Sequence, residues 1–337
     1  MEILIPDIWF EFLAQKNTFW VLLSLICSFV ILFKGADYFV SGSAGLATRL
    51  GVPHVIIGVT IVSLGTTSPE AAVSIMAAFA GKSGFAIGNA IGSVICNTAL
   101  IFGLGCTMTV IPVDKFVIHR QGRAKVIATL AFVGFCYLSL WASIGSLSRI
   151  FGIILIAALV WYSHKSLKWA KQHHQTGIVD ESILESAKTP FFLAIIFFIG
   201  LMMVIIGSRA LIGSALQLCR IFGIPETIIA ATVVAFGTAV PELATAVACI
   251  LKGHRQLLLG NVIGANVLNL LLVIGASLTI TKLQLPTMFY YLHLPALALI
   301  VVMFFAFAET SKKNFRRWYG PCFLMVFIAY VVIQYIA

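Results

Sequence analysis

The chain has 337 residues, of which 61% are hydrophobic and only 10% are charged. A soluble domain is roughly half apolar and about a quarter charged, so this composition excludes a water-soluble globular protein. The formal net charge of +10 does not indicate a nucleic-acid surface, because most Lys and Arg residues lie in short joints between apolar stretches.

Apolar stretches of about 20 residues, the length needed to cross a hydrocarbon core, recur along the chain. Residues 1–17 carry no signal-peptide pattern and are predicted to form an N-terminal interfacial segment. Lipid offers no hydrogen-bond partners, so backbone groups inside the membrane must bond to one another, in helices or closed barrels. Because the apolar runs do not alternate as barrel strands do, we expect helices and an all-α polytopic membrane fold. Ten transmembrane helices are predicted, over 18–45, 54–80, 84–111, 124–143, 146–168, 190–217, 226–251, 256–281, 287–308 and 318–336.

The Lys and Arg residues predict the orientation of these spans, because cytoplasmic joints retain positive charge. If the N-terminus is outside, the outer segments hold only Lys16, Lys82, Arg149, Arg220 and Lys282. The inner joints then hold Arg49, Lys115, Arg120, Arg123, Lys125, Lys165, Lys168, Lys171, Lys188, Lys252, Arg255, Lys312, Lys313, Arg316 and Arg317. We therefore expect a multi-pass protein of the cell inner (plasma) membrane with both termini outside.

The chain contains an internal repeat. Residues 51–106 match residues 223–278 at a constant shift of 172, and the residues that recur are the rare ones: Pro, Glu, Asn, Thr and clustered Gly. The two copies lie five spans apart, an odd number, so they cross the membrane in opposite directions. This predicts two inverted five-helix repeats, 18–168 and 190–337, joined by a cytoplasmic linker at 169–189. His173-His174 in the linker could bind a metal, but a solvated loop pair is the simpler interpretation.

Glu70 and Glu242 occupy equivalent positions in the two copies, well inside the spans, where a carboxylate is costly and is by default functional or paired. Each ends a Gly-Thr-x-x-Pro-Glu segment, and the proline should break the helix near Gly65 and Gly237 and free backbone oxygens. Carboxylates, hydroxyls and carbonyls together suit a hard cation such as Ca²⁺. We expect the two glutamates to face each other near mid-bilayer as a cation-binding pair.

Two further segments, at 88–92 and 260–264, read Gly-Asn-x-x-Gly, and each is followed five residues later by an asparagine, Asn97 or Asn269. Glycines at this spacing allow close helix packing. Because the asparagine recurs in both copies, we expect the segments also to bring the two amides against the broken helices.

The paired GTxxPE and GNxxG segments resemble the two α-repeats of the calcium/cation antiporter family, which includes the prokaryotic sodium/calcium exchangers, over nearly the whole chain. The resemblance implies an antiporter that exchanges a divalent cation, Ca²⁺ foremost, for Na⁺ by alternating access. Its partners would be inorganic cations and the lipid bilayer, with no cofactor, nucleic acid or protein partner. The implied ion ligands are Glu70, Glu242, Thr66, Thr238, Asn97, Thr67 and Ser93, with Asn269 at the position equivalent to Asn97.

Several positions depart from the sodium-coupled members. Ala239 and Ala265 stand where those proteins carry Ser, Asn269 stands where they carry Asp, and Val94 replaces an Asn beside Ser93. Each of the first three changes removes a hydroxyl or carboxylate that would ligate or hydrate an ion. Coupling of Ca²⁺, Mg²⁺ or Mn²⁺ to H⁺ is therefore the alternative, since two buried carboxylates that repel each other can accept a proton.

Other functional classes fit less well. An intramembrane enzyme would need a nucleophile, and neither Glu has a His or Cys in its motif. A passive cation channel is compatible with inverted symmetry, whereas a sensor lacks a soluble domain. Asp37 and Arg209 are equivalent by the same shift and could pair with each other, or Asp37 could pair with Lys34 one turn away.

Overall fold

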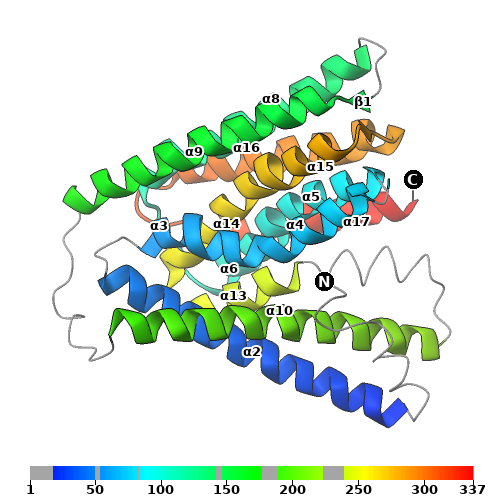
Figure 1. The fold of residues 1–337 in the computed structure, drawn as a ribbon. Coiled ribbons are helices and arrows are strands. Elements are labelled where there is room, and N and C mark those ends of the chain that lie inside the picture. Colours follow the sequence, from blue (N-terminus) through cyan, green and yellow to red (C-terminus); the bar gives the residue numbers. More distant parts are fainter. Residues whose placement is uncertain are drawn as a thin grey trace. The chain divides into compact units, whose positions relative to one another are not determined.

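The computed structural model describes residues 18–49, 54–79, 81, 83–141, 146–176, 189–222 and 239–336 (Figure 1). In the first half the helices are α2 (Thr18–Arg49), α3 (His54–Ile57), α4 (Ser63–Phe79), α5 (Ser83–Ile95), α6 (Gly103–Met108), α7 (Lys115–Val117), α8 (Arg123–Trp141) and α9 (Arg149–Thr176). In the second half they are α10 (Pro190–Ile221), α13 (Val240–Leu251), α14 (Arg255–Leu268), α15 (Ile274–Ile280), α16 (Leu294–Thr310) and α17 (Tyr319–Ile336). The all-α membrane fold is confirmed, and every predicted span carries a helix, the seventh from Val240 onward.

Within the described residues, five π-helical segments interrupt or extend these helices: η1 (Gly58–Val62), η2 (Cys96–Phe102), η3 (Ile118–Gly122), η6 (Asn269–Val273) and η7 (Phe289–His293). The shift of 172 residues carries η2 onto the stretch that contains η6, and carries η3 onto the stretch that overlaps η7. The repeat found in the sequence is therefore also present in the backbone. Wider turns of this kind are frequent at functional sites.

Some boundaries differ from the predicted ones. The fourth span begins at Lys115, before the predicted residue 124, because α7 and η3 continue directly into α8. The fifth begins at Arg149, since Ser146–Leu147 forms a short strand, β1, that pairs antiparallel with β2 (Leu283–Gln284). The linker predicted from residue 169 is helical as far as Thr176. The predicted interfacial segment 1–17 and the rest of the linker up to residue 188 lie outside the described residues.

The predicted break of the second span has a different form. The helix axis bends by 48° between His54–Ser68 and Glu70–Phe79, as expected for a proline at residue 69. The chain nevertheless stays helical through Gly65, so the prediction of an opened backbone at that residue was wrong. A π-helical turn lies before this helix, at Gly58–Val62, and the backbone is α-helical from Ser63 through Phe79.

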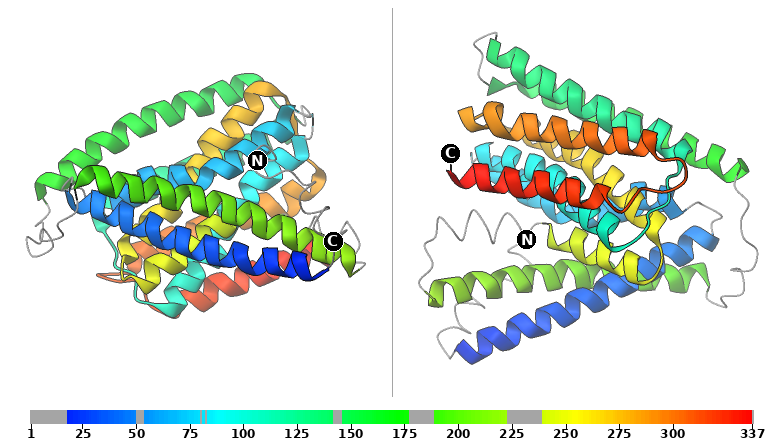
Figure 2. Two further views of the ribbon diagram at one scale, coloured as in Figure 1. Left: turned by 60° about the horizontal axis from the view of Figure 1, so that its bottom comes forward. Right: turned by 180° about the vertical axis from the view of Figure 1, so that it is seen from behind.

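The chain divides into two compact units, which take helices from both repeats. The smaller contains residues 1–46 and 187–248, and the larger contains residues 47–186 and 249–337. In the smaller unit α2 and α10 run side by side (Figures 1 and 2). Their contact is close because it is made at glycines: a Cβ at Gly42 would lie 2.6 Å from the backbone N of Phe197.

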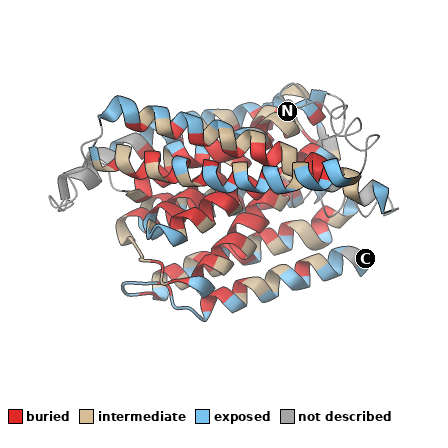
Figure 3. Cartoon of the chain, turned by 90° about the horizontal axis from the view of Figure 1, so that it is seen from below, coloured by how far each residue is buried: buried red, intermediate tan, exposed pale blue. Residues whose placement is uncertain are grey.

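In the larger unit α14 and α15 are central, since 89% of their most apolar stretch is buried. The stretch that ends in α8 is only 33% buried, and its exposed residues are mostly apolar, as in Trp141 and Ile127. Buried and exposed residues alternate along such outer helices (Figure 3). An apolar outward face suits contact with lipid, so the central helices are those that can hold polar groups away from it.

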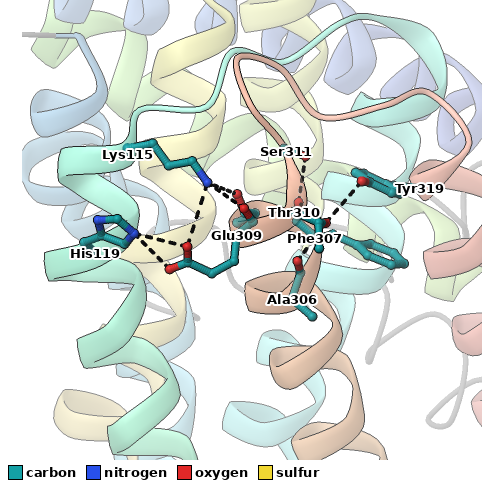
Figure 4. A network of polar contacts seen from close by, with 9 residues as sticks. Lys115, His119, Ala306, Phe307, Glu309, Thr310, Ser311 and Tyr319 are labelled. Carbon is teal, nitrogen blue, oxygen red and sulfur yellow. Dashed lines mark hydrogen bonds and ion pairs between the residues drawn. The ribbon is translucent and has the colours of Figure 1, made fainter.

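One end of the larger unit is fixed by backbone and charge. Val113 N donates to Lys313 O over 2.7 Å, which joins the segments that precede α7 and follow α16. Lys115 Nζ donates to the carbonyls of Ala308 and Glu309, at 2.8 Å each, where α16 ends (Figure 4). A cation here satisfies otherwise unpaired carbonyls at the negative end of the helix dipole.

Candidate cation site

Glu70 lies on α4 directly after the bend and is 0% exposed. Its Oε2 accepts a 2.8 Å hydrogen bond from Asn269 Nδ2, a residue 199 positions away in the second repeat. The Ser93 hydroxyl is close to the same carboxylate but not at hydrogen-bonding geometry. Among the described residues no donor reaches the other oxygen, Oε1. One half of the carboxylate is thus oriented by the protein, and the other half can accept an ion.

The hydroxyls of Thr66 and Thr67, just before the bend, differ in their hydrogen bonding. Thr66 Oγ1 donates to Asn261 Oδ1 over 3.3 Å, which links the GTxxPE segment of the first repeat to the GNxxG segment of the second. Thr67 Oγ1 is buried and has no hydrogen-bond partner in the described parts of the chain. Thr66 therefore fixes the relative position of the two helices, and Thr67 has a lone pair available.

Asn97 and Asn269 lie where their helices change to π-helical geometry, in η2 and at the start of η6. Both are buried, and within the described residues neither amide atom of Asn97 has a partner, nor does Asn269 Oδ1. A buried polar group without a partner costs on the order of 1–3 kcal/mol. Such groups persist where an ion or water completes their hydrogen bonding.

The second Gly-Asn-x-x-Gly segment packs as predicted. A Cβ at Gly260 would collide with the carbonyl of Val55, and one at Gly264 with that of Val59. Both glycines thus let α14 lie directly against the backbone of α3 and η1. This close approach brings the α14 asparagines within reach of α4, so in this segment the packing interpretation and the placement of the amides hold together. In the first segment the prediction of close packing was wrong, because an added Cβ at Gly92 meets no described atom within 4 Å.

The second glutamate, Glu242, belongs to the other compact unit. Glu242 is 1% exposed and lies in the first turn of α13, within the smaller unit, whereas Glu70 belongs to the larger unit. Their meeting therefore stays a prediction. Thr238 lies outside the described residues. Asp37 and Arg209 lie on α2 and α10 of one unit, and their pairing also stays a prediction.

Sequence reasoning missed part of this region. Lys125 was assigned to an inner joint, but it is 0% exposed on α8, and its Nζ donates to Thr98 Oγ1 over 3.1 Å. Thr98 Oγ1 also accepts a hydrogen bond from Asn266 Nδ2. The predicted span 124–143 placed Lys125 at its very beginning, and the residue was therefore counted with the joint. That assignment was wrong because residues 115–122 are helical and continue into α8, so Lys125 lies well inside the span.

Comparison with known proteins identifies the family. The sodium/calcium exchanger protein family matches residues 20–164 and 192–336, one match in each repeat. The chain belongs to the sodium/calcium exchanger family. It is therefore a multi-pass membrane cation antiporter, as the repeated motifs predicted.

Individual proteins match over nearly the full length of the chain. The chain is 32% identical over 306 residues to the membrane protein MJ0091 of Methanocaldococcus jannaschii, covering 89% of this chain and 93% of the other. It is 27% identical over 348 residues to the sodium/calcium exchanger MaX1 of Methanosarcina acetivorans, covering 93% and 98%. A structure of the sodium-calcium exchanger NCX_Mj soaked with Na⁺ and Sr²⁺ matches with a TM-score of 0.79 at 27% identity, covering 94% and 99%.

Proposed function

We propose that this protein exchanges Ca²⁺ for Na⁺ across the cell inner membrane by alternating access, with both termini outside. The observation that carries the proposal is the fully buried Glu70 carboxylate, oriented through one oxygen by Asn269 and open at the other. The unpartnered oxygens of Thr67 and Asn97 are buried as well, on α4 and η2. Carboxylate, hydroxyl and amide oxygens are the ligands that Ca²⁺ prefers.

The proposed roles of the ligands follow from their chemistry. Glu70 and Glu242 supply two negative charges, which neutralise one divalent ion or its monovalent replacements. Oxygens of Asn97, Asn269 and Ser93, together with those of Thr66, Thr67 and Thr238, would replace part of the hydration shell. Two carboxylates without a bound cation are costly in a dry interior. The switch between the inward-open and outward-open states is therefore disfavoured when no ion is bound. This penalty would couple the inward movement of one ion to the outward movement of another.

The two alternatives to Na⁺-coupled Ca²⁺ exchange are H⁺-coupled exchange and a passive cation channel. Coupling to H⁺, with Ca²⁺, Mg²⁺ or Mn²⁺ as the divalent ion, is favoured by the loss of ligand oxygens at Ala239 and Ala265 and of a charge at Asn269. In the structure Asn269 donates to Glu70, a role that an ionised aspartate could not fill. A passive cation channel would conduct without a counter-ion gradient.

Transport in proteoliposomes tests the proposal. Uptake of radioactive calcium is measured under an outward Na⁺ gradient and, separately, under an outward H⁺ gradient. We expect Na⁺-driven uptake that Glu70→Gln and Glu242→Gln each abolish. Glu309→Gln is the matched control, because Glu309 is a partly exposed carboxylate paired with His119 at the end of α16, and it should retain uptake (Figure 4).

The outcomes separate the candidates. Uptake driven by H⁺ and indifferent to Na⁺ would select the proton-coupled alternative. Uptake that needs neither gradient would indicate a channel. Full activity in both glutamate variants would show that these carboxylates do not bind the transported ion.

A further inference from the structure

Lys125 is a fully buried basic residue inside a membrane span, and the family site does not account for it. Its ammonium group lies 4.0 Å from the centroid of the Phe304 ring and donates to Thr98. Among the described residues no carboxylate forms an ion pair with it. A ring face and one hydroxyl compensate only part of the cost of burying a charge in lipid. A charge kept at this cost is by default functional.

The repeat shows that the fold does not need this polar group. The shift of 172 residues places Leu297 opposite Lys125, Leu270 opposite Thr98, and Val94 opposite Asn266. All three apolar counterparts are 0% exposed, so the equivalent positions of the other repeat are filled by ordinary hydrophobic side chains. The chain Lys125–Thr98–Asn266 therefore exists on one side of the pseudo-two-fold axis only. This asymmetry separates it from the residues that both repeats need for packing.

The polar chain ends next to the candidate cation site. Thr98 directly follows Asn97, and Asn266 lies one helical turn before Asn269, which donates to Glu70. Three hydrogen bonds and one helical turn, the latter spanning about 5–6 Å, thus connect the ammonium to the Glu70 carboxylate. At a separation on the order of 10 Å, a unit charge has a strong electrostatic effect in a poorly hydrated interior.

We propose that Lys125 is a specificity-determining residue, a fixed positive charge behind the cation site that weakens binding of each ion in proportion to the charge of that ion. This inference rests on the proposed function. With an effective dielectric constant of about 20 and a separation of about 10 Å, one unit charge lowers the affinity for a monovalent ion by about 16-fold and for a divalent ion by about 250-fold. Lys125 would thus hold divalent affinity down and let Na⁺ displace Ca²⁺.

Equilibrium binding to the purified full-length protein tests this. Dissociation constants for radioactive Ca²⁺ and Na⁺ are measured for the parent and for Lys125→Met, which removes the charge at similar volume. We expect the Na⁺ constant to fall by about 16-fold and the Ca²⁺ constant by about 250-fold, the square of the first factor. Lys125→Arg keeps the charge and should restore the parental ratio of the two constants.

Two further variants separate charge from packing. Thr98→Val breaks the hydrogen bond but keeps the ammonium, so it should change both dissociation constants by one common factor. Gln121→Met removes a buried hydrogen bond to Ser166 one turn before Lys125, and it should leave both constants at parental values. If Lys125→Met is not monodisperse, Lys125→Gln carries the same expectation, because glutamine keeps a donor but no charge.

Equal changes for the two ions in the neutral variants, or no change, would overturn the inference. If the parent protein binds neither ion, the proposed function itself fails. If the parent binds both ions and the neutral variants match it, only the role of Lys125 is refuted.

Discussion

Gly264→Ala should destabilise the protein, because the position has no room for a methyl group. The added Cβ would lie 2.7 Å from the carbonyl carbon of Val59 and would collide with the Val59 oxygen and the Ser63 hydroxyl. Ordinary contacts begin at 3.4 Å, so α14 must move away from η1 by at least about 0.7 Å. Overpacking of this kind costs about 3 kcal/mol, and the better helix propensity of alanine returns about 1 kcal/mol. The expected net loss is about 2 kcal/mol.

The same displacement has a local signature. The hydrogen bond from Thr66 to Asn261 is already 3.3 Å long, and a shift of this size would break it. Thermal unfolding of the purified protein in detergent is the assay, with Gly134→Ala as control, since that exposed glycine on α8 has no described atom within 4 Å of an added Cβ. We expect Tm to fall by several degrees for Gly264→Ala and not to fall for Gly134→Ala. Equal Tm values for the two variants would refute the packing argument.

Two further predictions concern residues outside the cation site. Lys115→Met removes the donor to the carbonyls of Ala308 and Glu309 and should lower the free energy of unfolding by about 1.5–3 kcal/mol in denaturant titration, whereas an unchanged midpoint would contradict the capping role. Burial and the nearby His54 ring, 5.3 Å away, lower the pKa of His254 below its ordinary 6.5, so the folded state binds fewer protons than the unfolded chain. Stability should therefore fall as pH drops below about 6.5, and His254→Gln should flatten Tm between pH 7 and pH 5.5; an unchanged slope would exclude this residue as the cause.

Much of the architecture could be predicted from the sequence. The spans follow from the length of apolar runs, and the inverted repeat follows from rare residues such as Glu70 and Glu242 recurring at one shift across an odd number of spans. Each of these properties is local or periodic along the chain. The close packing of Gly260 and Gly264 was likewise predictable, because glycine spacing on a helix specifies a face.

Other features were not accessible in this way. The bend of the second span was expected at an opened backbone near Gly65, but the helix bends by 48° and stays helical there, and the choice between bending and opening depends on packing. The start of the fourth span was missed because helix propensity does not distinguish a polar loop from a polar first turn. That error put Lys125 at the edge of the predicted span, where it was counted with the joint cations.

The sequence by itself determined the class of protein and the residue types available to a cation, because hydrophobicity and repeated motifs are properties of the linear chain. Only the tertiary structure decided which atoms meet: Asn269 on Glu70, Asn261 on Thr66, and Asn266 and Lys125 on one hydroxyl. These contacts join residues far apart in sequence, and they depend on how α14 packs against α4 and η2.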